Sequence, residues 1–259
     1  MLVDPTAPTA RLAEMLADVR VGVGEAPTLP ATVRWLEVTS DDEEPLADVV
    51  DPAPDAPAYF VFTSGTTGHP KAVTVTQRAA SAFAEDIGEY LAAFPGDRVL
   101  HVAAPSFDAA MLEMLTAASR RDARGGRRRQ LRCAALGDLL DSAAITHAVM
   151  TPSTLATVPV RDLPALRTLV LGGDRLTREI VDRWGDGRTL VNSYGPAEAT
   201  MFVTNSQPLR PGDDIVIGTP VRGVTVEVLD ERLRPVPAGV VGELYVSGPR
   251  LASGSRRCR

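Results

Sequence analysis

The stretch YFVFTSGTTGHPKAV, residues 59–73, begins as an apolar run and ends in a loop of small hydroxylated residues, two glycines and one lysine. The apolar run has the length and the aromatic and β-branched content of a buried strand, and the following glycine and proline stop it. Hydroxyl groups and backbone N–H groups at glycines suit phosphate oxygens, so the loop is a candidate phosphate site. Its members are Thr63, Ser64, Gly65, Thr66, Thr67 and Gly68.

Lys71 supports this interpretation because it is the only lysine in the chain. Apart from the histidines, all other basic side chains of the chain are arginine. The single lysine places a compact ammonium group beside the loop, where it can face the negative charge of a phosphate. The spacing differs from that of a P-loop, because the two glycines are too close together and Ala72 follows the lysine. An ordinary surface turn is the alternative for the loop taken by itself.

The composition describes a globular protein. With 259 residues, 44% of them hydrophobic, the chain can bury a substantial core. The 27 basic and 33 acidic residues give a net charge of −6, which argues against general binding of nucleic acid or of an anionic membrane surface. No apolar run is long enough to span a membrane and the N-terminus lacks signal-peptide features, so we expect a cytoplasmic protein. Two cysteines and three scattered histidines show no metal-ligand spacing.

Periodicity along the chain alternates between strand and helix. An amphipathic helix is expected over residues 9–20 and a strand at residues 32–38. After the loop, the pattern predicts a helix, a strand at residues 98–103 and a second helix from about residue 107, in the order βαβα. Three further short apolar strands are expected, at residues 145–151, 166–173 and 189–195.

This alternation predicts an α/β fold with a mainly parallel sheet covered by helices. Ligands of such sheets collect at the carboxyl ends of the strands, where the loop, Phe107-Asp108, and the residues after the later strands are expected. From about residue 213 the pattern changes to two antiparallel strands within residues 224–248. We therefore expect a core at residues 1–212 and a small β subdomain at residues 213–259.

Four motifs in this order resemble the adenylation domains of nonribosomal peptide synthetases, which belong to the adenylate-forming ligases. They are FTSGTTGHPKAV at 62–73, SFDAAMLEML at 106–115, LGGDRL with NSYGPAEAT at 171–176 and 192–200, and the segment 217–248. The resemblance implies the large N-terminal domain of that fold, with a small β-barrel-like subdomain. It also implies activation of an amino acid carboxylate with ATP and Mg²⁺, and transfer of the aminoacyl group to the phosphopantetheine thiol of a carrier protein.

The resemblance assigns roles residue by residue. Residues 64–71 would bind the β and γ phosphates of ATP, with Thr67 and Lys71 as catalytic residues. Glu198 would hold Mg²⁺. Asp108 would pair with the α-amino group of the substrate. The adenine would lie against Gly173, Asp174, Asn192, Tyr194 and Gly195. The remaining substrate pocket would be Ala109, Leu112, Val149, Val170, Gly172, Ser193, Met201 and Phe202, which implies a neutral apolar or aromatic amino acid, although these residues also suit a plain core.

The sequence departs from the family in two places. The family has a second, small domain carrying a lysine, and an aspartate for the ribose, which we expect to be absent from residues 1–259. Residues 119–132 hold seven arginines where relatives carry an apolar strand, which indicates either an out-of-frame segment or a disordered arginine-rich loop. Two function classes therefore stay open: an amino acid-activating enzyme, or a truncated or frame-shifted remnant that binds nucleotide or a partner without catalysis.

Overall fold

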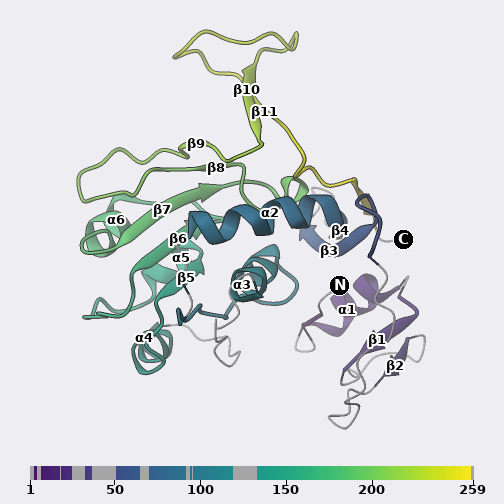
Figure 1. Cartoon of the computed structure of the whole chain (residues 1–259), viewed down its shortest axis with the longest axis horizontal. Helices are drawn as coiled ribbons and strands as arrows, with labels where there is room; N and C mark the ends of the chain where they lie inside the picture. The colour runs from purple at the N-terminus through teal and green to yellow at the C-terminus, as the bar shows by residue number, and fades with distance from the viewer. Residues whose placement is uncertain are drawn as a thin grey trace.

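The computed structural model describes residues 3–4, 7–17, 19–24, 33–36, 51–64, 70–91, 94, 96–118 and 133–257 (Figure 1). The arginine-rich segment 119–132 and the loop residues 65–69 lie outside the described residues. Within the described part, helices cover mixed β-sheets, which confirms the α/β class. None of the described helices is both long enough and apolar enough to cross a membrane.

The largest sheet has five strands in the order β5-β6-β7-β8-β9. β5 (His147–Met150), β6 (Thr168–Gly172) and β7 (Thr189–Tyr194) are parallel, as their apolar runs predict. β8 (Thr204–Asn205) and β9 (Thr219–Pro220) extend the sheet in antiparallel register, so it is mixed beyond its parallel centre.

Alternating residues of the parallel strands enter two different hydrophobic clusters, one on each face of the sheet. On one face, Leu169 and Leu171 join the cluster that includes residues of α4 (Cys133–Ser142), α5 (Pro152–Ala156) and α6 (Arg178–Trp184). The intervening Val170 belongs to the second cluster. Because side chains point to opposite faces at successive strand positions, one short strand serves both cores.

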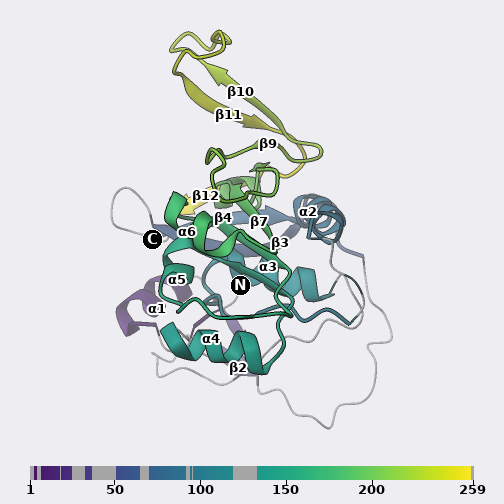
Figure 2. The same cartoon turned by 90° about the vertical axis from the view of Figure 1, so that its left-hand side faces the viewer.

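The second cluster joins the same sheet to two other helices and to a second sheet. α2 (Gln77–Tyr90) contributes Phe83 and Ile87, and α3 (Asp108–Ala118) contributes Leu112. Figure 2 shows α3 and α4 on opposite sides of the central strands. The first turn of α3 therefore lies on the Val170 face of the sheet.

The quoted stretch forms a hairpin rather than a strand that runs into a helix. β3 (Pro57–Ser64) pairs antiparallel with β4 (Pro70–Thr76), and β12 (Gly254–Arg257) pairs with the other edge of β4. The βαβα prediction is wrong here, because the alternation in residues 72–76 makes a second strand with Val73 and Val75 fully buried. Residues 98–103 also form only an isolated bridge between Val99 and His147.

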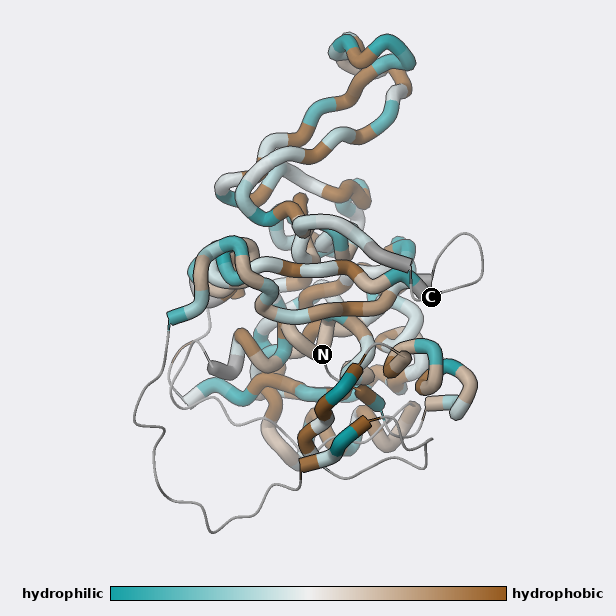
Figure 3. Tube along the Cα trace, turned by 90° about the vertical axis from the view of Figure 1, so that its right-hand side faces the viewer, coloured by the Kyte–Doolittle hydropathy of each residue, from teal (hydrophilic) through white to brown (hydrophobic). Residues whose placement is uncertain are grey.

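The strands within residues 213–257 are divided among three sheets, and no closed barrel is present in the described part of the chain. β9 completes the central sheet, β12 joins the β3–β4 hairpin, and β10 (Thr225–Leu229) pairs only with β11 (Glu243–Ser247). The β10–β11 hairpin projects from the body of the molecule, and apolar and polar residues alternate along it (Figures 1 and 3). The two predicted antiparallel strands are confirmed, while the 212/213 boundary stays a prediction.

The N-terminal elements are shorter than their sequence patterns predict. α1 (Thr9–Leu16) buries Leu12, Met15 and Leu16 and ends before Arg20. β1 (Val21–Val23) and β2 (Arg34–Leu36) form a separate parallel pair.

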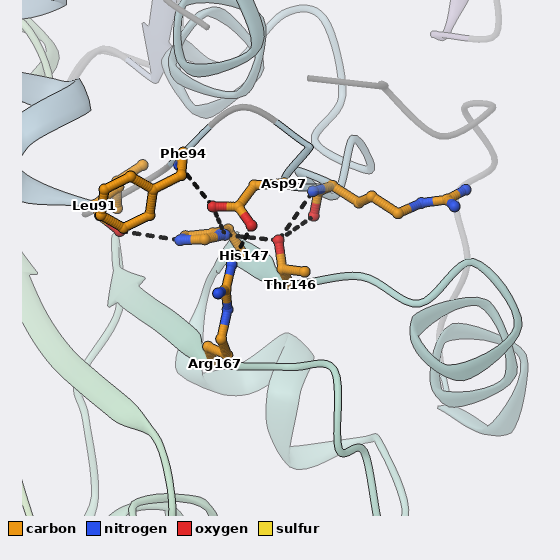
Figure 4. Close-up of polar contacts among 7 residues, drawn as sticks. Leu91, Phe94, Asp97, Thr146, His147 and Arg167 are labelled. Atoms are coloured by element: carbon orange, nitrogen blue, oxygen red, sulfur yellow. Dashed lines mark hydrogen bonds and ion pairs between the residues drawn. The ribbon is translucent and has the colours of Figure 1, made fainter. Parts of the chain in front are cut away.

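A buried polar cluster ties β5 to the segment that follows α2 (Figure 4). His147 Nε2 donates to the carbonyl of Leu91 at 3.0 Å, and its Nδ1 lies 2.8 Å from Thr146 Oγ1. The Asp97 carboxylate lies 3.7 Å from His147 Nδ1 and pairs with the Arg167 guanidinium. Both nitrogens of the His147 ring are therefore held by hydrogen bonds within this cluster.

Candidate functional site

Asp108 is the first residue of α3, and its side chain is largely removed from solvent. Burial raises the pKa of this carboxyl group, the charge of Glu198 raises it further, and the backbone N–H groups of Asp108 and Ala109 lower it. A partly buried carboxylate is costly unless a cation faces it. The position therefore favours a positively charged group of a ligand.

Apolar residues predicted for the substrate pocket come together in one cluster on the α3 side of the sheet. The fully buried members are Leu112, Val149, Val170 and Met201, and the partly buried Phe202 packs against them. The register of the sheet places Val149 opposite Val170. Four separate segments of the sequence thus converge near the start of α3.

Gly172 and Ser193 face each other at the carboxyl ends of β6 and β7. A Cβ atom at Gly172 would lie 2.7 Å from the Ser193 carbonyl oxygen and 3.3 Å from Phe202 Cε1. Only glycine allows this approach of the Phe202 ring to the strand end, so Gly172 shapes this wall of the pocket. Ala109, the remaining predicted pocket residue, is partly buried beside Asp108.

The turn after Glu198 holds two non-glycine residues in the left-handed region, Thr200 with φ 54° and Met201 with φ 74°. Strain of this kind persists only where surrounding contacts hold it. Thr200 Oγ1 donates to the carbonyl of Arg250 at 2.6 Å, and Ala252 N donates to the carbonyl of Glu198 at 2.8 Å. The segment around residue 250 therefore fixes this turn, a contact without a signal in the sequence.

The residues predicted to hold adenine surround the ends of β6 and β7. Gly173 has φ +76°, and Asp174 is exposed, with its Oδ1 accepting a hydrogen bond from Arg175 N at 2.7 Å. The buried Asn192 donates through Nδ2 to the carbonyl of Val216 at 2.9 Å. The Tyr194 ring is 44% exposed at the end of β7, where a planar base can stack on it.

Gly195 follows directly after Tyr194, and a Cβ atom there would lie 2.2 Å from the Met201 carbonyl oxygen. A larger residue would therefore push the 194–195 backbone away from the strained turn. The close approach connects the proposed adenine side of the site to the substrate pocket.

The described residues fix the two ends of the candidate phosphate loop. Thr63 and Lys71 are paired across the β3–β4 hairpin, and both are partly buried. β4 also lies against the short 3-10 helix η1 (Ala197–Ala199), which carries the exposed Glu198. The lysine strand and the Glu198 turn are thus neighbours, whereas Gly65, Thr66, Thr67 and Gly68, with the Ser64 side chain, fall outside what the structure describes.

Glu113 is a buried carboxylate in α3 that sequence reasoning missed. Its oxygens accept hydrogen bonds from the backbone N–H groups of Val102 and Ala103, each at 3.2 Å, and lie 2.6 Å from His101 Nδ1. Burial raises the pKa of this carboxyl group, and the two backbone N–H groups and His101 oppose that rise. Glu113 therefore attaches α3, and with it Asp108, to residues 101–103, which follow the Val99 bridge.

A cavity of about 470 Å³ adjoins the pocket on its β7–β9 side. Phe202 lines it, and its ring lies 6.4 Å from that of Phe83, centroid to centroid. Arg250 pairs with Asp86 at this cavity, and its guanidinium lies 5.6 Å from the Phe83 ring centroid. The cavity therefore borders the apolar cluster around Val170, because Phe83, Ile87 and Phe202 line the cavity and also pack in that cluster.

In this fold, a carboxylate-bearing apolar cluster lies beside the carboxyl ends of β6 and β7. The chain belongs to the AMP-binding enzyme family, whose model matches residues 1–255.

Curated relatives include nonribosomal peptide synthetases. The chain is 45% identical over 217 residues to CymA, a probable non-canonical nonribosomal peptide synthetase of Salinispora arenicola, covering 82% of this chain and 3% of that protein. It is 35% identical to novobiocin biosynthesis protein H of Streptomyces niveus, covering 97% of this chain and 45% of that protein. The chain thus spans less than half the length of these relatives.

Solved structures of adenylation proteins have the same fold. The N-terminal subdomain of NpsA from Klebsiella oxytoca, in complex with 3-hydroxybenzoyl-AMSN, aligns with a TM-score of 0.84 and 21% identity, over 98% of this chain and 69% of that chain. FmoA3 bound to alpha-methyl-L-serine-AMP aligns with a TM-score of 0.84 and 25% identity, over 97% of this chain and 31% of that chain. The resemblance seen in the sequence is confirmed, and the structural match is to the N-terminal part of an adenylation domain.

Proposed function

We propose that this chain activates an amino acid carboxylate with ATP, giving an aminoacyl adenylate and pyrophosphate. The observation that carries the proposal is Asp108, a largely buried carboxylate beside the apolar cluster of Leu112, Val149, Val170 and Met201. An α-ammonium group would supply a cation for the Asp108 carboxylate, and the cluster would receive an uncharged side chain. An acid without the amine would leave Asp108 buried without a counter-charge, so the site selects amino acids.

The reaction itself requires positioning and charge neutralisation. A substrate carboxylate oxygen attacks the α-phosphorus, a new P–O bond forms, and the bond to the bridging oxygen breaks as pyrophosphate leaves. Lys71 and Thr67 are proposed to neutralise the negative charge that develops on the phosphate oxygens as pyrophosphate leaves. The other hydroxyl and N–H groups of the loop are proposed to surround the same oxygens. Tyr194 and its neighbours are proposed to hold the adenine.

The chain's acidic residues fit a magnesium ion held mainly by nucleotide oxygens. Glu198 is exposed, and no group of three metal-binding side chains occurs among the described residues. Mg²⁺ usually keeps waters and binds through one or two carboxylates plus substrate phosphates, which matches a lone carboxylate. When bound, the ion would neutralise phosphate charge; Glu198 would hold it beside the strand that carries Lys71.

The proposed substrate is a neutral apolar or aromatic amino acid, because the pocket side chains beyond Asp108 are apolar or small apart from Ser193. The proposed acceptor of the aminoacyl group is the phosphopantetheine thiol of a carrier protein. Similarity to peptide synthetases over most of this chain supports that acceptor.

Amino acid-dependent exchange between ATP and pyrophosphate tests the proposal. We expect exchange with one or a few apolar or aromatic amino acids, and loss of that exchange in Asp108→Ala. Binding of ATP without any amino acid-dependent exchange or amino acid binding would instead favour the non-catalytic remnant.

A further inference from the structure

Tyr59 lies beside the proposed substrate pocket although it belongs to a different sheet. It is on β3, opposite Val75 in the hairpin, and its side chain is 6% exposed. It packs in the same hydrophobic cluster as Leu112 and Val170. Leu112 is one helical turn after Asp108 in α3, so the cluster that holds Tyr59 reaches the Asp108 end of the helix.

The phenol hydroxyl of Tyr59 is buried and has no hydrogen-bond partner within the described part of the chain. A buried hydroxyl normally finds a partner, and leaving it without one destabilises the fold. A phenylalanine would fill the same space without that cost. The hydroxyl is therefore available to donate to a group that comes within its reach.

Electrostatics connect this hydroxyl to Asp108. Burial raises the pKa of the Tyr59 phenol, and the negative charge of Asp108 raises it further, so the phenol stays protonated and can donate. The charge of Glu198 also acts on Asp108: its carboxylate can only accept hydrogen bonds, and its negative charge disfavours the ionised form of Asp108. Of these two groups, only the Tyr59 hydroxyl can stabilise an Asp108 carboxylate.

We propose that Tyr59 is a positioning residue for Asp108: when the amino acid enters, the Tyr59 hydroxyl donates to the Asp108 carboxylate and keeps it ionised toward the α-ammonium. The inference rests on the proposed function, because it requires Asp108 to bind the ammonium. In this arrangement one carboxylate oxygen would accept from the phenol and the other would remain for the ligand, so the buried hydroxyl would gain its partner in the occupied state.

The test compares Tyr59→Phe with wild type, using Tyr245→Phe as the matched control. Tyr245 lies on β11 in the projecting hairpin, where its hydroxyl donates to Glu243 at 3.2 Å. The ligands are the apolar amino acid that wild type binds most tightly and the desamino analogue of that amino acid. Calorimetry gives the dissociation constants at several pH values, and thermal unfolding reports stability.

We expect Tyr59→Phe to raise the dissociation constant of the amino acid about tenfold, the scale of one hydrogen bond to a charged group, and to change that of the analogue less than about twofold. Loss of the donor raises the pKa of Asp108, so amino acid binding should fail at a higher pH than in wild type as the solution is acidified. Thermal stability should be unchanged or higher. Tyr245→Phe should match wild type in every measurement.

Three results would overturn the inference. If wild type binds the amino acid and Tyr59→Phe binds it equally well with the same pH profile, Tyr59 does not act on Asp108. If Tyr59→Phe lowers the melting temperature and weakens both ligands equally, the hydroxyl is structural. If wild type binds nucleotide but no amino acid, the proposed function fails, and this inference fails with it for that distinct reason.

Discussion

At the scale of single residues, Asp108 is the proposed determinant of what the pocket recognises, and its burial lowers the stability of the fold. Apolar packing around the first turn of α3 and the charge of Glu198 raise the pKa of this carboxyl group above its usual value of 3.8. The folded chain therefore holds the proton more tightly than the unfolded chain. This contribution favours folding below the unfolded pKa and is lost as the pH rises through the folded pKa.

Asp108→Asn tests that sign. We expect the stability advantage of the variant over wild type to be larger at pH 7 than at pH 4. The reason is that the amide carries no charge to desolvate, whereas Asp108 ionises as the pH rises. Urea unfolding at both pH values gives the difference in unfolding free energy. A difference that is the same at both values would show that Asp108 is not perturbed in the folded chain.

Lys71 is the residue on which nucleotide binding is expected to depend. We expect Lys71→Ala to weaken ATP binding by about tenfold or more in calorimetry, since it removes the ammonium that faces the phosphates. Arg78→Ala is the matched control, because Arg78 lies just beyond β4 and pairs with Asp55 at 3.1 Å on the surface. Equal affinities of wild type and Lys71→Ala would refute the phosphate role of the loop.

At the scale of elements, the site depends on how α3 is attached to the sheet. Glu113 bonds the backbone N–H groups of Val102 and Ala103 from within the helix, and the clustering of Leu112 with Val170 holds the same helix against the strands. The position of Asp108 follows from these two attachments.

Glu113→Gln should loosen the first of them. Oε1 accepts from both backbone N–H groups, while Oε2 lies 3.2 Å from Ala103 N and 2.6 Å from His101 Nδ1. In the amide, an NH₂ donor replaces Oε2, so the second contact with Ala103 N and the charge that faces His101 are lost. We expect a loss of about 1–3 kcal/mol in unfolding free energy, together with weaker amino acid binding. Glu85→Gln, on the exposed side of α2, is the control. Unchanged stability in Glu113→Gln would mean that the charge and the second oxygen of Glu113 do not hold the helix.

At the scale of the whole molecule, local pattern predicted the parallel strands, because each is a short apolar run bounded by turns. The resemblance to adenylation domains implied that Val149 and Val170 share one pocket, and the strand register sets the two residues opposite each other. The sequence pattern does not predict the second hairpin strand, because the helical face of Phe83 and Ile87 is the next regular feature identified after the loop.

Long-range contacts carry no such local signal. The Arg250 carbonyl accepts from the Thr200 hydroxyl, and the Glu113 carboxylate accepts from Val102 N and Ala103 N. Each of these contacts joins residues from separate elements and becomes visible only when those elements are packed together. The burial of the Tyr59 hydroxyl likewise has no local signal in the sequence. The roles assigned to the loop and to Glu198 stay predictions, because they depend on ligands.

The most direct test of the account is a calorimetric titration of an apolar amino acid into wild type and into Asp108→Ala, each with a non-hydrolysable ATP analogue present. We expect wild type to bind the amino acid, and to bind its desamino analogue far more weakly. We expect Asp108→Ala to lose about 3–5 kcal/mol of amino acid affinity, the typical effect of breaking a buried charge pair, and to retain nucleotide binding. Equal binding of the amino acid by both proteins would contradict the central role of Asp108.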